Sequence, residues 1–337
     1  MVDLLIRVDA TPSMGMGHLM RCLAFAEHCQ KQSIETLFVC QPLMAEAKHR
    51  LAQKGFLIEE LNSEFASQEE AMQLLTLAHK SHIKTIVFDG YHFTEDYFNQ
   101  FKNVTYQLGM IDDFALAPSF FDWVINFQPW AQSLSYQTKN KLLGLEYFLL
   151  RKEFWPYLGK MTTQKKHILI TMGGTDPHQQ TQRLVGILDQ LSLDVDICVI
   201  MGTTHPAVEE AILNYNNPQR ISLHVNPKDM PSLMAEAIFA ITAGGGTCWE
   251  LAAMGVPAIV ITQAENQQRV VEFVEKYQTG INLGYYSDVS DQLIKESIST
   301  LMVNDPLKKA MQTAGLELNI GSKISTVADF IKEQCHA

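Results

Sequence analysis

An excess of positive charge is absent from this sequence. Lysine and arginine total 26 residues against 37 aspartates and glutamates, so the formal net charge is −11. General nucleic-acid binding usually needs a basic face, and we therefore expect none. An anionic ligand is still compatible with this charge, because helix N-termini and backbone N–H groups create local positive potential.

Metal-ligand spacings are also missing. None of the six cysteines belongs to a Cys-x-x-Cys pair, and no His-x-x-x-His pattern occurs. Because most of the cysteines lie within apolar runs, they are predicted to be buried free thiols of a reducing compartment. We expect no metal site and no cofactor.

Long hydrophobic runs are absent too. No apolar segment approaches the length of a membrane span, and Met1-Val2-Asp3 leads directly into a predicted strand without a signal-peptide layout. The sequence therefore predicts a cytoplasmic protein without a membrane span, and a monomer is compatible with it. Its 337 residues, 47% hydrophobic and 19% charged, are enough for two globular cores.

Short apolar runs alternate twice with segments of helical periodicity. The first series predicts strands at Leu4–Val8, Thr36–Cys40, Thr85–Phe88, Val104–Met110 and Trp123–Asn126, with helices at Leu19–Gln30, Ala45–Lys54 and Gln68–Lys80. The second predicts strands at Ile168–Met172, Val195–Ile200, Ser222–Val225, Phe239–Thr242 and Ala258–Ile261. Such alternation is typical of a parallel sheet covered by helices on both faces. We therefore expect an α/β protein with two Rossmann-like, doubly wound domains.

The polar stretch Arg151–Lys165 marks the expected join between the domains. It separates an N-terminal domain, residues 1–155, from a C-terminal domain, residues 156–320. Residues 321–337 are predicted to form a terminal helix that packs on the body. Ligands of open α/β sheets bind beyond the carboxyl ends of the strands, so the expected site is a cleft between the two domains.

The loop after the first strand carries the strongest local signal. Gly15-Met-Gly17-His18 opens a predicted helix, an arrangement that brings backbone N–H groups up to a phosphate. Phosphate binding alone does not need a histidine. The helix dipole disfavours the imidazolium, and a neutral His18 can act as a general base, although a histidine that only caps or packs is the alternative. Asp9 ends the strand and could orient His18, contact a sugar or hold the loop.

Two further strand ends of the first domain carry polar side chains. Tyr91 follows Asp89 and Gly90, and it can present a hydroxyl to a sugar or serve as an aromatic wedge at a domain surface. The pair Asp112-Asp113 could suggest acid–base or metal chemistry. Helix capping or loop bonding explains this pair better.

The C-terminal domain contains two glycine loops after strands. Gly173-Gly174-Thr175 is expected to approach a ligand, and Asp176-Pro177 resembles a helix cap with proline at the first helical position. Gly245-Gly246-Thr247 precedes an apolar helix and is predicted to bind an anion. Glu250, about one turn further, is placed to accept hydrogen bonds from ribose hydroxyls, although a carboxylate in a first helical turn is also favourable by itself.

Asn266 and Gln267 follow the last predicted strand of the series. Their amides suit sugar hydroxyls or an acetamido group. The alternative is that Asn266 caps a helix.

Together these motifs resemble the UDP-2,4-diacetamido-2,4,6-trideoxy-β-L-altropyranose hydrolases of pseudaminic acid biosynthesis, which are related to spore-coat polysaccharide proteins and MurG-like glycosyltransferases. The resemblance extends from Ile6 to about Gln268. It is clearest in Gly15 to Cys22, Asp89-Gly-Tyr91, Leu143 to Phe154, Gly173 to Asp176, and Gly244 to Glu250 with Asn266-Gln267. The chain departs from the family pattern at Gly246, where serine is more frequent, and at Leu251, where arginine is.

The resemblance implies a glycosyltransferase B fold and metal-independent hydrolysis of the bond between UDP and the anomeric carbon. His18 would be the catalytic group, Tyr91 and Asn266 would lie near the sugar, and Gly245–Glu250 would hold the diphosphate and ribose. UDP is a good leaving group, so a second catalytic carboxylic acid is not obligatory. A glycosyltransferase and a non-catalytic nucleotide-sugar-binding module are the alternatives, and the histidine argues against the latter.

Overall fold

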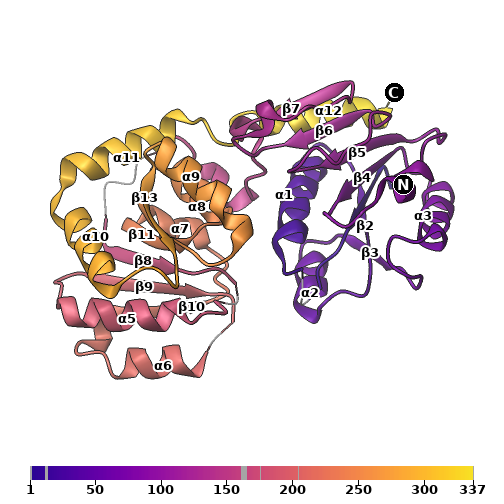
Figure 1. Ribbon diagram of the computed structural model, residues 1–337. Coiled ribbons are helices and arrows are strands. Elements are labelled where there is room, and N and C mark those ends of the chain that lie inside the picture. Colours follow the sequence, from indigo (N-terminus) through magenta and orange to yellow (C-terminus); the bar gives the residue numbers. More distant parts are fainter. Residues whose placement is uncertain (1, 12–13, 161–164, 175, 204, 337) are drawn as a thin grey trace. The chain divides into compact units, whose positions relative to one another are not determined.

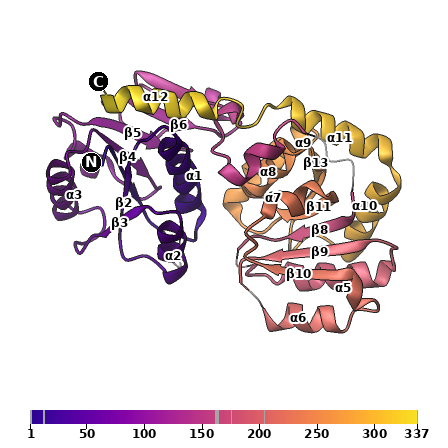
Figure 2. The ribbon, with the colours of Figure 1, turned by 180° about the vertical axis from the view of Figure 1, so that it is seen from behind.

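Two parallel β-sheets organise the chain. The computed structural model describes residues 2–11, 14–160, 165–174, 176–203 and 205–336. It divides into unit 1, residues 1–152 with 321–337, and unit 2, residues 153–320. Each unit is a twisted parallel sheet with helices around it (Figures 1 and 2). The expected α/β class with two doubly wound, Rossmann-like sheets is confirmed.

Unit 1 has a seven-stranded sheet in the order β3-β2-β1-β4-β5-β6-β7. Its strands are β1 (Leu4–Val8), β2 (Thr36–Cys40), β3 (Leu57–Glu60), β4 (Thr85–Asp89), β5 (Gln107–Ile111), β6 (Trp123–Asn126) and β7 (Asn140–Leu143). Its helices are α1 (Gly17–Lys31), α2 (Ala45–Gln53), α3 (Gln68–Lys80), α4 (Glu95–Asn99) and α12 (Ile324–His336), with 3-10 turns η1 (Ala131–Ser133) and η2 (Leu145–Tyr147).

The central strands of unit 1 are buried on both faces, as helix-covered parallel sheets require. All five residues of β1 are fully buried, and α1 and α3 lie on opposite faces of the sheet in both views. The stripe Leu19, Cys22, Leu23 and Ala26 is buried on α1 as its spacing predicts. Helix α12 packs against α1, so the C-terminal segment returns to the unit in which the chain begins.

Unit 2 has a six-stranded sheet in the order β10-β9-β8-β11-β12-β13. Its strands are β8 (His167–Thr171), β9 (Asp196–Met201), β10 (Ile221–Val225), β11 (Ala237–Ala243), β12 (Ala258–Thr262) and β13 (Gly280–Tyr285). Its helices are α5 (Gln180–Leu191), α6 (Pro206–Leu213), α7 (Met230–Ala235), α8 (Thr247–Ala253), α9 (Gln268–Lys276), α10 (Asp291–Val303) and α11 (Asp305–Glu317). The 3-10 turns are η3 (Lys152–Tyr157), which crosses the boundary, η4 (Pro218–Arg220) and η5 (Glu265–Gln267).

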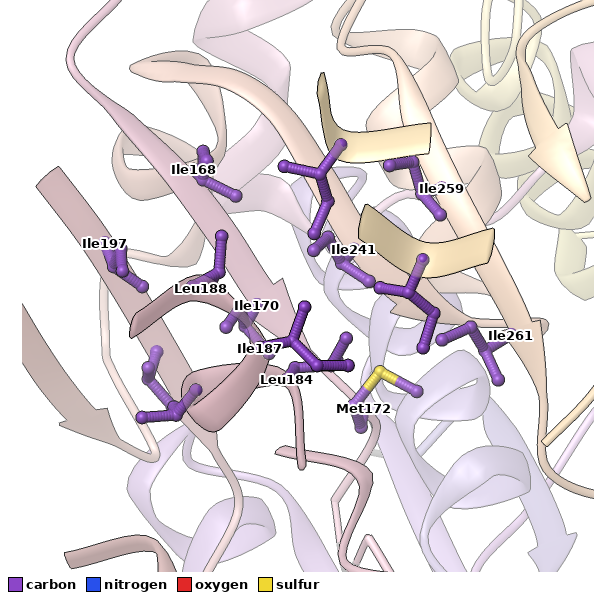
Figure 3. Close-up of a cluster of buried hydrophobic side chains, with 14 of the residues drawn as sticks. Ile168, Ile170, Met172, Leu184, Ile187, Leu188, Ile197, Ile241, Ile259 and Ile261 are labelled. Atoms are coloured by element: carbon purple, nitrogen blue, oxygen red, sulfur yellow. The ribbon is translucent and has the colours of Figure 1, made fainter. Parts of the chain in front are cut away.

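Branched aliphatic side chains fill one face of the second sheet. Alternate positions of β8, β11 and β12 point to one face of the sheet, because successive side chains of a strand face opposite sides, and side chains of α5 and α10 join the same cluster. Figure 3 shows these side chains packed together. They come from Ile168, Ile170, Ile241, Ile259 and Ile261 of the strands and from Leu184, Ile187 and Leu188 of the helix. This packing holds the carboxyl ends of β8 and β11 at one edge of the sheet.

The sequence did not predict three of the strands. Each of the three, β3, β7 and β13, lies at an edge of its sheet and pairs on one side only. Their side chains are half-buried or exposed at most positions, so they lack the continuous apolar run that reveals a central strand. The strand expected at Val104–Met110 is shifted in the structure to Gln107–Ile111.

His28 is a buried histidine inside α1, and it makes unit 1 sensitive to acid. Its Nε2 donates to the Leu150 carbonyl at 3.1 Å, and burial lowers its pKa to about 4 from an ordinary value of 6.5. Between pH 4 and 6.5, His28 therefore binds a proton in the unfolded chain but not in the folded chain. The stabilisation is therefore complete above pH 6.5 and is lost as the pH falls toward 4.

We expect His28→Gln to remove part of the pH dependence of stability. For the native chain, this histidine alone should lower the free energy of unfolding by roughly 3 kcal/mol between pH 6.5 and 4. Urea denaturation at a series of pH values gives the free energy of unfolding as a function of pH for the native chain and for the variant. The slope of this dependence should be smaller for the variant. His79→Gln, which changes an exposed histidine of α3, is the matched control and should keep the native slope.

Candidate functional site

The carboxyl ends of β1 and β4 form a topological switch point in unit 1. From β1 the chain proceeds to β2 and β3 on one side, and then returns to β4 on the other side of β1. Ligands of doubly wound sheets bind in the crevice that such a reversal opens. The loop leading to His18 follows β1, and the Asp89–Tyr91 segment ends β4. Two motifs that lie 71 residues apart in the chain therefore meet at this edge.

His18 and Asp89 form a hydrogen-bonded pair at the switch point. His18 lies in the first turn of α1, and its Nδ1 is 2.7 Å from Oδ1 of Asp89. The Asp89 carboxylate is fully buried, whereas the His18 side chain keeps 14% of its surface exposed. Among the described residues, the N-cap residue Met16 makes no side-chain cap, and His18 lies at the positive end of this helix.

The carboxylate decides which nitrogen of His18 carries the proton. Arg21 Nη2 also lies near Nδ1, at 3.1 Å, but it donates to Asp89 Oδ1 at 2.6 Å. A lone pair on Nδ1 would face a carboxylate oxygen at 2.7 Å, which is repulsive. We therefore assign the proton to Nδ1 and the lone pair to Nε2. Within the described part of the chain, no group forms a hydrogen bond with Nε2.

Arg21 ties this pair to a second carboxylate. Its Nε donates to Asp89 Oδ2 at 2.7 Å, and its Nη1 donates to Asp113 Oδ2 at 2.6 Å. Burial opposes ionisation of Asp89, but the charge and hydrogen bonds of Arg21 outweigh it and lower the pKa of Asp89 to about 2. The thiol of Cys22 donates to the same carboxylate at 3.1 Å. Asp89 is therefore ionised and fixed in orientation.

Tyr91 lies beside the histidine and is anchored by the second carboxylate. The edge-to-face contact of its ring with His18 has a centroid distance of 4.5 Å, and its hydroxyl donates to Asp113 Oδ2. Burial and the Asp113 charge raise the pKa of this hydroxyl, which stays protonated. The residue is still 46% exposed. Tyr91 is thus partly exposed while its hydroxyl is already engaged by Asp113.

The two glycines of the first loop differ in their roles. Gly15 has a φ of +72°, in the left-handed region that favours glycine. Gly17 begins α1, is exposed, and would have no heavy atom within 4 Å of an added Cβ. As far as the described residues show, the space over the start of the helix, next to His18, is therefore open.

Asp9 is buried and holds the end of β1. Its Oδ1 accepts from the Gln41 backbone N–H at 2.7 Å and lies 2.7 Å from Arg7 Nη1. Oδ2 is buried without a hydrogen-bond partner in the described residues, 3.6 Å from His92 Nε2. These contacts tie the end of β1 to the segment after β2 and to Arg7, and none of them is with the loop that leads to His18. Asp89 is the residue that orients His18.

A second switch point occurs in unit 2, at the carboxyl ends of β8 and β11. The chain leaves β8 toward β9 and β10 and returns to β11 on the opposite side of β8. Gly173 and Gly174 follow β8, and the Gly244–Thr247 run follows β11. Both glycine loops thus lie at the position where doubly wound sheets bind ligands.

The loop after β8 is exposed at its glycines. Gly173 has a φ of +92°. Gly174 packs closely on Gly202, since a Cβ added at Gly202 would lie 2.5 Å from the Gly174 carbonyl oxygen. Thr175, expected to contact a ligand, lies outside the described residues. Asp176 accepts from the N–H groups of Gln180 and Thr181 and so caps α5.

The predicted position of Pro177 at the first turn of that helix is wrong. Helix α5 begins at Gln180. Gln179 has a φ of +51°, in the left-handed region, and this keeps the residues between Asp176 and Gln180 out of the helix.

The loop after β11 carries unpaired backbone donors. The short helix α8 begins at Thr247, and among the described residues it has no side-chain cap at its N-cap position, Gly246. Among the described residues, the N–H groups of Gly246 and Thr247 have no backbone acceptor. A Cβ on Gly244 would lie 2.6 Å from Val271 Cγ1, so this glycine allows the loop to pack on α9. Glu250, one turn into α8, is partly exposed.

Asn266 and Gln267 lie in η5 beside this glycine loop. Asn266 is exposed, whereas the Gln267 side chain accepts from the Gln263 backbone N–H at 2.9 Å. Gln263 in turn donates to the Met172 carbonyl at 2.8 Å, which links the segment after β12 to the end of β8. No side-chain cap of α9 by Asn266 is present.

Asp89, Arg21 and Asp113 form the network around His18, although none of them was assigned to the candidate site from the sequence. The position of Asp89 at the end of β4 was a usable signal, because β4 lies next to β1 in such folds. The Asp112-Asp113 pair was a weaker signal for Asp113, because only one of the two carboxylates belongs to the network. Asp112 instead accepts from N–H groups of its own loop. Arg21 is one turn beyond His18 on α1 and therefore shares its helix face.

Within the described residues, no group of three or more His, Cys, Asp or Glu side chains could hold a metal ion. In the same part of the chain, no helix is long and apolar enough to cross a membrane.

The two sheets and their switch-point loops define a glycosyltransferase B-type fold. The structure of MurG from Acinetobacter baumannii is similar, with a TM-score of 0.70 at 15% identity over 98% of this chain and 99% of that one. The Staphylococcus aureus MnaA structure, determined with UDP, gives a TM-score of 0.65 at 14% identity, over 98% of this chain and 95% of that one.

Sequence comparisons point to the same class. Residues 167–333 match the glycosyltransferase family 28 C-terminal domain. The chain is 26% identical to the spore coat polysaccharide biosynthesis protein SpsG of Bacillus subtilis over 194 residues, which are 56% of this chain and 57% of that protein. It is also 26% identical, over 199 residues and 54% of its length, to a Helicobacter pylori protein. That protein is named pseudaminic acid cytidylyltransferase and UDP-2,4-diacetamido-2,4,6-trideoxy-β-L-altropyranose hydrolase, and 34% of it is covered.

Proposed function

We propose that the chain hydrolyses a UDP-2,4-diacetamido-2,4,6-trideoxy-hexose, releasing UDP and the free sugar. The observation that carries this proposal is the His18–Asp89 pair, in which Nε2 has no partner in the described residues. Phosphate binding needs no oriented histidine, whereas activation of water does. The similarity to the Helicobacter pylori protein, whose name includes this hydrolase activity, supports the choice of sugar.

In this mechanism His18 is the general base. Its Nε2 takes a proton from a water molecule while the water oxygen forms a bond to the anomeric carbon. The bond between that carbon and the diphosphate oxygen breaks, and its electron pair leaves with UDP. Attack from the face opposite UDP gives inversion. Asp89 stabilises the imidazolium that forms, as the carboxylate of a catalytic triad does.

The UDP group is assigned to the loops at the switch point of unit 2. Gly245, Gly246 and Thr247 would bind the diphosphate through backbone N–H groups, and Glu250 would accept from the ribose hydroxyls. The match to the family 28 domain and the UDP found with MnaA support this assignment. Gly173, Gly174 and Thr175 would approach the same substrate, and Asn266 and Gln267 would bind its sugar. Dipoles of the glycine loops would stabilise the charge that develops on UDP.

The remaining sugar contacts are assigned to unit 1. Gly15 and Gly17 would let the substrate come close to His18, since space is open over both. Tyr91 would pack against the sugar ring, and Asp9 would accept a sugar hydroxyl through Oδ2, which has no partner in the described residues.

We expect Glu250→Ala to weaken UDP binding by roughly 10- to 100-fold, because hydrogen bonds to charged groups are worth about 1.5–3 kcal/mol. Isothermal titration calorimetry with UDP measures the dissociation constant. Glu272→Ala, which removes an exposed carboxylate from α9, is the matched control. Equal affinities of the two variants would contradict the ribose role.

A glycosyltransferase is the second candidate, favoured by the family 28 match. One experiment separates these two functions from each other and from a non-catalytic binding module. The protein is incubated with the UDP-diacetamido sugar in buffer, without an acceptor, and NMR follows the products. Release of UDP and free sugar supports hydrolysis. Release that begins only after an acceptor alcohol is added would identify a transferase, and an intact bound ligand would identify a binding module.

A further inference from the structure

We propose that Phe114, with Leu116 in the same loop, provides an apolar subsite that selects sugar nucleotides carrying methyl or acyl groups. This inference rests on the proposed use of a UDP-sugar and adds the basis of its selectivity. Both residues follow β5, and both are exposed, Phe114 by 45% and Leu116 by 38%. Neither takes part in the hydrogen-bond network around His18.

Aromatic contacts connect Phe114 to the candidate base. The Phe114 ring packs against the Tyr91 ring with a centroid distance of 5.0 Å and an interplanar angle of 67°. Tyr91 makes the next edge-to-face contact, with His18. An aromatic row therefore runs from the histidine through Tyr91 to Phe114, and its last two members are exposed. A substrate whose anomeric carbon is near His18 would extend along this row.

The loop that presents the two side chains is held rigidly. The buried carboxylate of Asp112 accepts from the N–H groups of Phe114 and Ala117 at 2.9 and 3.0 Å. Ala115 has a φ of +63°, in the left-handed region, and its N–H donates to the Tyr136 hydroxyl at 3.3 Å.

Asp113 anchors the same loop from inside. Its carbonyl accepts from Trp130 Nε1 at 3.1 Å. Its carboxylate holds both Arg21 and the hydroxyl of Tyr91. The position of the loop is thus coupled to the position of the candidate base.

This arrangement is unfavourable for folding alone. The buried carboxylate of Asp112 and the left-handed backbone of Ala115 each have a free-energy cost. Together they hold Phe114 in a position where its side chain is partly exposed to water. Rigid, exposed apolar side chains beside a catalytic group are typical of ligand contacts. Methyl groups of acetamido substituents, or of a deoxygenated C6, are the apolar parts of a sugar that such side chains would cover.

The test compares sugar nucleotides that differ in apolar substituents. In a His18→Ala background, which prevents turnover, calorimetry measures the affinity for the UDP-diacetamido-trideoxy sugar and for UDP alone. We expect Phe114→Ala to weaken binding of the acylated sugar nucleotide about tenfold and to leave UDP binding unchanged. Phe114→Leu, which keeps an apolar side chain, should restore most of the affinity. Leu213→Ala removes a side chain that is 77% exposed on α6 and should change neither constant.

Equal losses for UDP and the acylated sugar, or no loss for either, would overturn the subsite. The absence of measurable binding of the acylated sugar nucleotide would overturn it as well. If the proposed hydrolase function is wrong but the subsite is right, the results differ. The protein with native His18 would then release no UDP, while the ratio of its affinities for the acylated sugar nucleotide and for UDP would still depend on Phe114. Thermal unfolding of each variant checks that the loop substitution leaves the fold intact.

Discussion

Replacement of His18 by alanine should lower kcat for UDP release by roughly 10²- to 10⁴-fold, the contribution expected of one general base. The dissociation constant for UDP should stay within a factor of about two, because UDP is assigned to the loops of unit 2 and a substitution in unit 1 removes none of their contacts. Single-turnover kinetics with the UDP-diacetamido sugar measure the first quantity, and calorimetry measures the second.

His49→Ala is the matched control for this substitution. His49 is an exposed residue of α2 whose side chain forms a hydrogen bond with Gln53 of the same helix, so its removal should leave kcat unchanged. A His18→Ala enzyme that retained most of its turnover would remove the base assignment. The pair Tyr91 and Asp113 would then have to supply the chemistry.

Asp89→Asn should be nearly as damaging as the loss of the histidine itself. An asparagine can donate its amide N–H to Nδ1, which favours the tautomer with the proton on Nε2 and removes the lone pair that accepts a proton from water. We expect kcat to fall by roughly 10²- to 10⁴-fold, because residues that act as a unit lose their function together. The double variant with His18→Ala should be no slower than either single variant.

Stability and pH provide the controls for Asp89. Because its pKa is lowered to about 2 from 3.8, its stabilising contribution is complete above pH 3.8 and is lost as the pH falls toward 2. Asp89 therefore stays ionised above about pH 5, and any change of kcat with pH in that range has to come from another group. Asp113→Asn removes the charge of the other carboxylate that holds Arg21 and leaves the His18–Asp89 pair in place. It should reduce kcat much less. An equal loss from both would mean that Arg21, and not the tautomer of His18, controls the rate.

Local sequence patterns predicted most of the central elements. The strands at Leu4–Val8, Thr36–Cys40 and Trp123–Asn126 have the predicted bounds, since each is an apolar run buried by a parallel sheet. Edge strands such as β13 were missed because half of their surface faces solvent and the apolar run is interrupted. Element type follows from local periodicity, whereas the exact start of a helix depends on loop contacts, as Asp176 and Gln179 show for α5.

The sequence by itself determined the fold class, the two glycine loops and the histidine after the first strand. These signals are local, because a strand, a turn and a helix start are specified by neighbouring residues. The tertiary structure decided which carboxylate orients that histidine. Asp9 is nearer along the chain, but Asp89 is nearer in space, because β4 pairs directly with β1 across the switch point. Pairing of distant strands is a property of the whole sheet, and no local pattern in the sequence records it.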